Sequence, residues 1–268
     1  MKINPQMQYI PVFLEAAKAG GKIVREYFGK NLETIAKTSA ADFRTKADVE
    51  SETAILAILE KAYPEFDILS EERGETLNGS EYTIVVDPLD GTNNFVSGIP
   101  NFTILITLLR GKHAIAGLIY HPMIDAAYYA EDGKGAFLNG APIRVNNESD
   151  ATHAALSFTA GYGNYAQQAG IVTSALYDNL HLKRVLSNWS GAADACLVAC
   201  GKLEAIINDG NEAYDVVASK IIGREAGAKI TDINGNPEQD DTNTVFLMSN
   251  GTSLHEKILE SWRKVRQP

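Results

Sequence analysis

Asp87 and Asp90, three residues apart, are the side chains in this sequence best placed to do chemistry. The apolar and β-branched residues 83–86 before them predict a buried strand. Pro88 lacks a backbone donor, so strand pairing is expected to stop there. Two carboxylates this close repel each other unless a cation lies between them. Because oxygen ligands suit Mg²⁺ or Mn²⁺ better than zinc or copper, the spacing predicts a site for a hard cation.

The next two residues, Gly91 and Thr92, suit an anion. Gly91 permits a tight turn or a close backbone approach, and exposed N–H groups at the start of a helix or turn bind anions. A cation site beside an oxyanion site is the arrangement used in metal-assisted phosphate chemistry. Because Asp, Pro and Gly also favour ordinary surface turns, residues 87–91 alone leave both interpretations open.

Length and composition bound the class of protein. The chain has 268 residues, 45% of them hydrophobic, which is enough for one large globular domain or two lobes. Its formal net charge of -10 disfavours general binding to nucleic acid or to membrane surfaces. The same charge repels a phosphate substrate, so metal ions would be needed to reverse the local sign.

Cysteine usage and hydropathy indicate the cellular compartment in which the protein works. Cys196 and Cys200, four residues apart on an expected helix, are typical of a core face rather than of a disulfide. No charged-then-apolar signal segment opens the sequence, and no apolar run approaches the length of a membrane span. We therefore expect a cytoplasmic protein with no membrane or nucleic-acid partner.

The elements that must position these residues fall into two halves. The first half is expected to hold amphipathic helices and a sheet with antiparallel or mixed pairing. The second half alternates strands and helices, as layered α/β proteins do. We predict one domain over residues 1–268, with an N-terminal lobe of about 1–150 and a C-terminal α/β lobe of about 151–268. The expected helices cover 5–28, 46–63, 166–179, 192–199, 213–226 and 253–265, and the expected strands cover 66–69, 83–86, 102–109, 114–120, 126–130, 135–138, 156–158, 183–186, 203–208, 229–232 and 245–248.

Three further acidic positions are candidates for the same site. Glu71, followed by Glu72, ends an expected strand, where α/β proteins place active groups, although two exposed glutamates before a loop are also ordinary. Asp48 stands three residues after Thr45 in a capping-box pattern, which needs no active site but would hold the carboxylate rigidly. Asp215 lies at the start of an expected helix, where interaction with the helix dipole also explains it.

Other charged residues are assigned to structure or left open. Glu225 lies late in the same helix, where a carboxylate is electrostatically poor, and is expected to be structural. Asp232 opens a segment that lacks the later glutamate of a calcium loop, so a turn is expected. The five histidines include no His-x-x-x-His pair, which argues against a zinc hydrolase. Lys37 and Arg44 face either a phosphate or solvent, and the sequence does not decide between the two.

Three segments together match a known family. They are Ser-Glu-Glu at 70–72, Asp-Pro-Leu-Asp-Gly-Thr-Asn-Asn-Phe at 87–95 and Tyr-Asp-Val-Val-Ala-Ser-Lys-Ile-Ile-Gly-Arg-Glu-Ala-Gly at 214–227. With these motifs the chain resembles, over nearly its whole length, the inositol monophosphatase family of Mg²⁺-dependent, lithium-sensitive phosphatases. The 87–95 motif is highly specific, and its order and distance relative to the 214–227 motif make a chance match improbable.

The resemblance implies a fold, cofactors and residue roles. The fold would be a layered αβαβα sandwich of the inositol monophosphatase and fructose-1,6-bisphosphatase type, and the protein would form a homodimer. Two or three Mg²⁺ ions would bind, with Mn²⁺ as an alternative. The resemblance implies metal ligands at Glu71, Asp87, the Leu89 carbonyl, Asp90 and Asp215, water activation by Asp48, Thr92 and Glu71, and substrate contacts at Asp90, Gly91, Thr92, Gly191, Asn208 and Asp215.

Two departures from the family pattern bear on the substrate. Tyr214 stands where the family usually has Trp, and Asn208 aligns where inositol phosphatases tend to carry a glutamate for sugar hydroxyls. We predict a phosphomonoesterase that cleaves a small polyol or sugar phosphate by direct attack of a metal-activated water, with inositol 1-phosphate as first candidate. Fructose 1,6-bisphosphate, 3'-phosphoadenosine 5'-phosphate and histidinol phosphate stay open. The alternative of another class is a non-enzymatic protein-binding role on the same fold.

Overall fold

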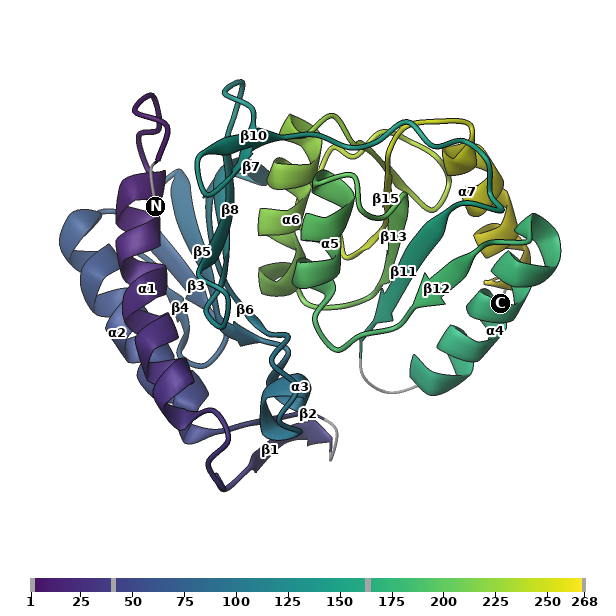
Figure 1. Cartoon of the computed structure of the whole chain (residues 1–268). Coiled ribbons are helices and arrows are strands. Elements are labelled where there is room, and N and C mark those ends of the chain that lie inside the picture. Colours follow the sequence, from purple (N-terminus) through teal and green to yellow (C-terminus); the bar gives the residue numbers. More distant parts are fainter. Residues whose placement is uncertain (1–2, 40–41, 162–164, 267–268) are drawn as a thin grey trace.

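The computed structural model describes residues 3–39, 42–161 and 165–266. Two β-sheets alternate with three pairs of helices, so the chain forms five layers in the order helix, sheet, helix, sheet, helix (Figure 1). This arrangement is the αβαβα sandwich that the family resemblance implied. The division of the single domain into two lobes near residue 150 stays a prediction, although the two sheets draw their strands from either side of that position.

The first sheet has eight strands and carries the motif at 87–95. All of its neighbouring strands pair antiparallel except β3 and β5, which are parallel, so the expected antiparallel or mixed pairing is confirmed. The strand order is β10-β9-β8-β7-β6-β5-β3-β4. The strands are β3 (Asp67–Ser70), β4 (Gly74–Thr76), β5 (Tyr82–Asp90), β6 (Thr103–Arg110), β7 (His113–His121), β8 (Ala126–Glu131), β9 (Ala136–Leu138) and β10 (Ala141–Ile143).

The second sheet has five strands in the order β12-β11-β13-β15-β14. Strand β11 pairs in parallel with β12 and β13, whereas β15 runs antiparallel to both of its neighbours. The expected alternation of strands and helices in this half is therefore confirmed. The strands are β11 (Ala155–Ala160), β12 (Arg184–Leu186), β13 (Ala205–Asp209), β14 (Lys229–Asp232) and β15 (Val245–Ser249).

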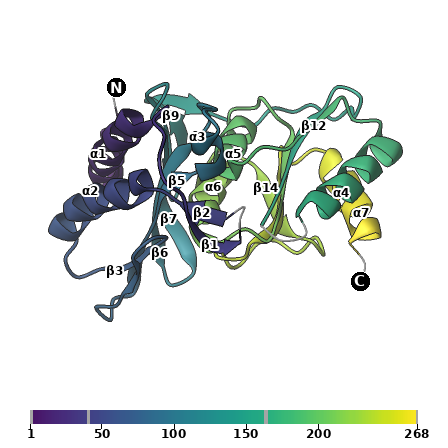
Figure 2. The same cartoon turned by 90° about the horizontal axis from the view of Figure 1, so that it is seen from below.

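Helices cover both sheets and fill the space between them (Figures 1 and 2). The outer pairs are α1 (Ile10–Tyr27) with α2 (Lys46–Ala62), and α4 (Tyr165–Leu180) with α7 (Leu254–Val265). The central pair is α5 (Gly191–Ala199) with α6 (Ala213–Glu225). Gly117 of β7 permits the close approach of α6, because a Cβ atom there would lie 2.5 Å from Cγ2 of Ile221. Tight packing against the first sheet fixes where the N-terminus of α6 can place a side chain.

Several local expectations were wrong. The polar stretch at 37–48 was expected to be irregular, but β1 (Ile35–Ser39) and β2 (Asp42–Arg44) pair antiparallel there as a hairpin. The short strands β4 and β10 were missed. Helix α1 begins at Ile10 rather than near residue 5, because Pro11 fits the first turn of a helix. Strand β5 continues past Pro88 to Asp90, and a short helix α3 (Thr92–Val96) follows it.

Candidate active site

A bulge in β5 carries the two aspartates of the central motif. Asp87 pairs with Leu105 and Asp90 pairs with Thr103, so two residues of β5 lie opposite one residue of β6. Such a bulge bends a strand and redirects its side chains. It also explains why the strand survives Pro88, since the proline falls where the ladder is already interrupted. Two hydrogen bonds fix the bulge: Leu89 N–H donates to Asp87 Oδ1 (2.9 Å), and Ser51 Oγ donates to the Pro88 carbonyl (3.0 Å).

Asp87, Asp90 and Asp215 converge in space. One carboxylate oxygen of each lies within 4.8 Å of those of the other two. Asp215 reaches this position from the first turn of α6, where its Oδ2 accepts a hydrogen bond from Glu212 N–H (2.9 Å) in a capping box. The dipole interaction expected at this helix start is therefore compatible with a place in the cluster.

Burial and mutual repulsion dominate the electrostatics of this cluster. Burial, with the neighbouring carboxylates, raises the pKa of Asp87 and of Asp215 well above the ordinary value. Burial raises the pKa of Asp90 to about 6, although hydrogen bonds from Ser190 and Thr103 oppose the shift. Buried carboxylates with raised pKa values are stabilised by a cation placed between them. The donor set, which consists of oxygen atoms, therefore fits a hard divalent cation.

Glu71 lies at the edge of this cluster, on the turn after β3. Its carboxyl group lies close enough to that of Asp87 for the two groups to interact electrostatically, and Lys37 Nζ lies 2.7 Å from its Oε1. Burial raises the pKa of Glu71 to about 7 in spite of the lysine. Glu71 thus faces the cluster with Asp87, while one of its oxygens is engaged by an ammonium group.

Lys37 and Arg44, which the sequence left open, are both engaged in ion pairs. Lys37 contacts Glu72 as well as Glu71, and Arg44 lies 3.0 Å from Glu72 Oε2. The side chain of Glu72 is only 2% exposed, so it is not the solvated glutamate that the ordinary interpretation expected. These pairs fasten the β1–β2 hairpin over the turn that carries Glu71.

Thr92 joins the cluster to the start of helix α2. Its Oγ1 lies 3.1 Å from Asp48 Oδ1 and 3.0 Å from the Leu89 carbonyl oxygen. Asp48 is fully buried, and its Oδ2 accepts hydrogen bonds from the N–H (2.7 Å) and the hydroxyl (2.6 Å) of Thr45. The predicted capping box is therefore confirmed, and the second oxygen of the same carboxylate meets Thr92.

The backbone conformation and the close neighbours of Gly91, at the start of α3, both require a glycine. Its φ is +89°, a left-handed conformation that favours glycine. A Cβ atom there would lie 3.0 Å from the carbonyl oxygen of Trp189 and 3.2 Å from that of Asn101. The conformation and the space both select glycine, and Gly91 and Thr92 follow the acidic bulge directly, as the sequence suggested.

The second wall of the site comes from the C-terminal half. Ser190 Oγ donates to Asp90 Oδ2 (2.5 Å), and Gly191 follows it at the start of α5. A Cβ atom at Gly191 would lie 3.1 Å from Cγ2 of Thr159. Asn211 connects Asn208 to Thr159, because its Nδ2 lies 2.8 Å from Asn208 Oδ1 and 3.2 Å from Thr159 Oγ1. The structure therefore brings Gly191 and Asn208 to one wall and links that wall to Asp90.

Sequence reasoning missed several residues of the site. Ser190 and Thr103 both donate to Asp90, and Glu52 accepts hydrogen bonds from the turn that carries Glu71. Serines and threonines carry no pattern of their own in the sequence. Glu52 had a usable signal, since it stands four residues after Asp48 and so shares a face of the same helix.

Two residues expected to be structural have that role. The carboxylate of Glu225 accepts hydrogen bonds from Gly133 N–H (2.9 Å) and Gly135 N–H (2.7 Å), and so joins the end of α6 to the turn after β8. Asp232 accepts a hydrogen bond from Asn236 N–H (2.9 Å), as a turn requires. The first contact explains why a carboxylate is tolerated late in a helix.

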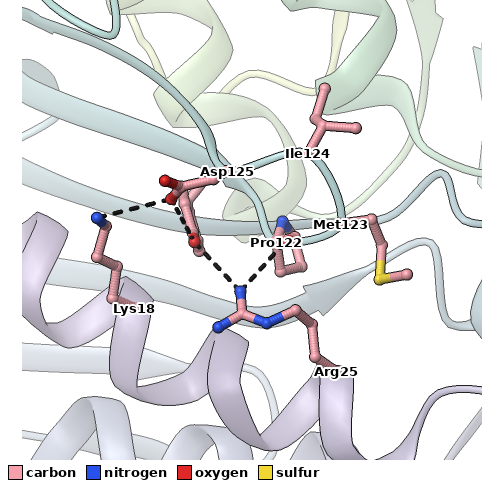
Figure 3. Close-up of a pocket in the computed structure, with 7 residues that line it drawn as sticks. Lys18, Arg25, Pro122, Met123, Ile124 and Asp125 are labelled. Carbon is pink, nitrogen blue, oxygen red and sulfur yellow. Dashed lines mark hydrogen bonds and ion pairs between the residues drawn. The ribbon is translucent and has the colours of Figure 1, made fainter. Parts of the chain in front are cut away.

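An open cavity of about 550 Å³ lies between α1 and the turn after β7 (Figure 3). Its charged side chains are paired with one another or with backbone: Lys18 lies 3.6 Å from Asp125, and Arg25 donates to the Pro122 carbonyl (3.1 Å). None of the predicted site residues lines it. This cavity is therefore separate from the acidic cluster.

Among the described helices, none combines the length and the apolar character needed to cross a membrane.

The layered fold and the family motifs around its acidic cluster define a phosphoric monoester hydrolase of the metal-dependent kind. The model of the inositol monophosphatase family matches residues 6–267, so the chain belongs to that family. A relative named fructose-1,6-bisphosphatase/inositol-1-monophosphatase, from Aquifex aeolicus, is 30% identical over 96% of each chain. An inositol-1-monophosphatase from Caulobacter vibrioides is 32% identical over 93% of this chain and 99% of its own.

Solved structures agree with this assignment. An IMPase from Thermotoga maritima superposes with a TM-score of 0.88 at 26% identity, covering 97% of this chain and 98% of its own. The extragenic suppressor protein suhB from Bartonella henselae gives the same TM-score at 28% identity, covering 95% of this chain and 98% of its own. The expected fold class and family are therefore confirmed.

Proposed function

We propose that this protein is a Mg²⁺-dependent phosphomonoesterase that hydrolyses a small polyol or sugar phosphate by direct attack of water. The observation that carries the proposal is the convergence of Asp87, Asp90 and Asp215 beside the Thr92–Asp48 pair. The first three supply negative oxygen ligands, and the pair supplies a hydroxyl held by a carboxylate. A cation site next to a group that can orient water is what phosphate-ester hydrolysis requires.

The metal ligands in this proposal are the side chains of Glu71, Asp87, Asp90 and Asp215 and the Leu89 carbonyl. The carboxylates fit divalent cations because the three aspartates lie close together and the pKa values of all four groups are raised. Two or three Mg²⁺ ions, or Mn²⁺ in their place, would supply the Lewis acidity that activates water and stabilises the leaving oxygen. Binding them also reverses the repulsion that a chain with net charge -10 exerts on a phosphate.

The remaining residues of the site orient water and substrate. Asp48 holds the Thr92 hydroxyl, and together with Glu71 this pair orients the attacking water and takes up its proton. The backbone N–H groups of Gly91 and Thr92 hold the phosphate, because left-handed Gly91 opens the chain there. Gly191 and Asn208, on the opposite wall, contact the alcohol part of the substrate together with Asp90 and Asp215.

Inositol 1-phosphate is the first candidate substrate. The amide of Asn208 donates to the Thr244 carbonyl (2.7 Å) and accepts from Asn211, so this wall offers sugar hydroxyls a neutral group. Fructose 1,6-bisphosphate, 3'-phosphoadenosine 5'-phosphate and histidinol phosphate therefore stay candidates. By its family resemblance, the enzyme is expected to be inhibited by millimolar lithium, to be cytoplasmic and to form a homodimer.

A non-enzymatic role is the competing function. A relative from Pasteurella multocida is named Nus factor SuhB and is 31% identical over 87% of this chain. Against this alternative, every proposed metal position keeps a competent group. The test is release of phosphate from the four candidate substrates, with Mg²⁺ and with a chelator in its place. Turnover that depends on Mg²⁺ supports the phosphatase, whereas no turnover on any of the four would favour the binding role.

A further inference from the structure

The first two turns of helix α2 contact three separate segments of the candidate site. Asp48 meets Thr92, Ser51 Oγ donates to the Pro88 carbonyl in the bulge, and Glu52 meets the turn after β3. Residues three and four positions apart lie on one face of a helix. A single helix face therefore sets the relative positions of the turn that carries Glu71, the bulge and Thr92.

Glu52 accepts more hydrogen bonds from the site than Asp48 or Ser51 makes with it. Its side chain belongs to a residue only 5% exposed, and its Oε1 accepts hydrogen bonds from Glu72 N–H (2.9 Å), Arg73 N–H (3.2 Å) and the hydroxyl of Ser70. Glu71 itself donates its N–H to the Val86 carbonyl (3.2 Å). The backbone on both sides of Glu71 is thus tied down, on one side to strand β5 and on the other to Glu52.

This restraint opposes two forces that would move Glu71 away from the acidic cluster. The Glu71 carboxylate faces Asp87, whose negative charge repels it, and the hairpin offers Lys37 as a competing partner. A ligand on an unrestrained turn would move away from the cluster, because repulsion and the lysine both favour that movement. Hydrogen bonds behind a metal ligand commonly hold such a ligand in its binding orientation.

We propose that Glu52 is a positioning residue that holds Glu71 in the acidic cluster and thereby sets the affinity of the site for a divalent cation. The inference rests on the proposed function in one respect, namely that Glu71 is a metal ligand. Glu52 acts through hydrogen bonds to the backbone of the turn and to the hydroxyl of Ser70 at the end of β3, and in this proposal it does not itself contact the cation. Its loss would therefore weaken metal binding only as far as Glu71 contributes to it.

The test measures Mn²⁺ binding directly, from the paramagnetic resonance signal of free Mn²⁺ in titrations of the full-length protein. Glu52→Ala is expected to weaken Mn²⁺ binding about tenfold to a hundredfold, the range found for loss of groups that support a ligand. The matched control is Glu60→Ala in the same helix. Glu60 pairs with Arg73 of the same turn (2.6 Å) but at the surface, so its removal is expected to leave Mn²⁺ affinity unchanged.

A double mutant separates positioning from general damage to the fold. If Glu52 acts through Glu71, Glu52→Ala adds little to the loss already caused by Glu71→Gln. An equally large loss in both backgrounds would overturn the inference, as would wild-type affinity in folded Glu52→Ala. Should that variant fail to fold, Glu52→Asp decides, because the shorter side chain is expected to weaken binding and wild-type affinity would refute the role. A wild-type protein that binds no Mn²⁺ would instead overturn the proposed function, and the inference with it.

Discussion

The hydroxyl of Thr92 and the carboxylate of Asp48 lie 3.1 Å apart, although 44 positions separate them in the sequence. The other oxygen of Asp48 is tied to Thr45 at the start of α2, so one oxygen is left for Thr92. The carboxylate that caps helix α2 is therefore also the one that holds Thr92 in the proposed catalytic pair. Together with the Leu89 carbonyl oxygen, 3.0 Å away, this arrangement holds the hydroxyl beside the acidic cluster.

Thr92→Ala is expected to lower kcat by on the order of 100-fold, because the hydroxyl that Asp48 orients is lost. The measurement is steady-state phosphate release at saturating Mg²⁺. Thr53→Ala serves as the matched control, since Thr53 lies exposed on α2 and its hydroxyl donates to the Val49 carbonyl (2.8 Å) of its own helix. An unchanged kcat in Thr92→Ala would place this hydroxyl outside the chemistry.

Asp87→Asn is expected to abolish most activity while the protein stays folded. The substitution removes a ligand charge but keeps an oxygen that can accept the hydrogen bond from Leu89 N–H. Phosphate release and thermal unfolding of the same preparation check the two halves of this expectation. Asp178→Asn, at an exposed position of α4, is the control with wild-type activity. Near-normal turnover by Asp87→Asn would contradict its assignment as a ligand.

Stability without metal is expected to fall as the pH rises. The pKa of Glu71 is raised from 4.5 to about 7 and that of Asp90 from 3.8 to about 6 in the folded protein. The folded state therefore binds these protons more tightly than the unfolded state, and the free energy of unfolding decreases between about pH 4 and pH 7. Ionised carboxylates bind Mg²⁺, so the ion should offset this loss.

Differential scanning calorimetry at pH 5 and pH 8 checks this expectation. In a chelator, Tm should be several degrees lower at pH 8 than at pH 5, and added Mg²⁺ should raise Tm more at pH 8. The double variant Glu71→Gln with Asp90→Asn is the comparison, and its Tm should depend less on pH because two of the titrating carboxylates are gone while Asp87 and Asp215 remain. A Tm that is independent of pH in the wild-type protein, or a larger Mg²⁺ effect at pH 5, would contradict it.

Lys220→Ala is expected to destabilise the protein by about 3 to 5 kcal/mol, because it leaves the largely buried carboxylate of Glu238 without a charged partner. Lys220 is fully buried in α6, and its Nζ contacts Glu238 Oε2 (2.8 Å) and the Asn243 carbonyl (2.6 Å). Urea unfolding of the wild-type protein and of each variant measures the change in the free energy of unfolding. Lys264→Ala, which breaks a solvent-exposed pair with Glu260, should change the free energy of unfolding far less. Equal losses of unfolding free energy in both variants would show that the buried pair contributes no more to stability than the surface pair.

Much of the fold followed from local sequence signals. The cap of α2 was predicted from Thr45 and Asp48, because a capping box joins residues only three positions apart. Strand β14 lies where its residues were expected, since alternation and turn residues act within a few positions. The predicted start of strand β5 was correct to within one residue, but its predicted end came too early, because a bulge at Pro88 depends on the pairing with β6.

By itself, the sequence determined the family to which the chain belongs and which residues are candidates for its chemistry, because residue types and short spacings can be read along the chain. Only the tertiary structure decided that Lys37 pairs with Glu71, that Ser190 donates to Asp90 and that Glu52 supports the turn of Glu71. The physical reason is that each of these contacts joins separate elements. Whether they meet depends on how helices pack on the sheets, and no local pattern specifies that packing.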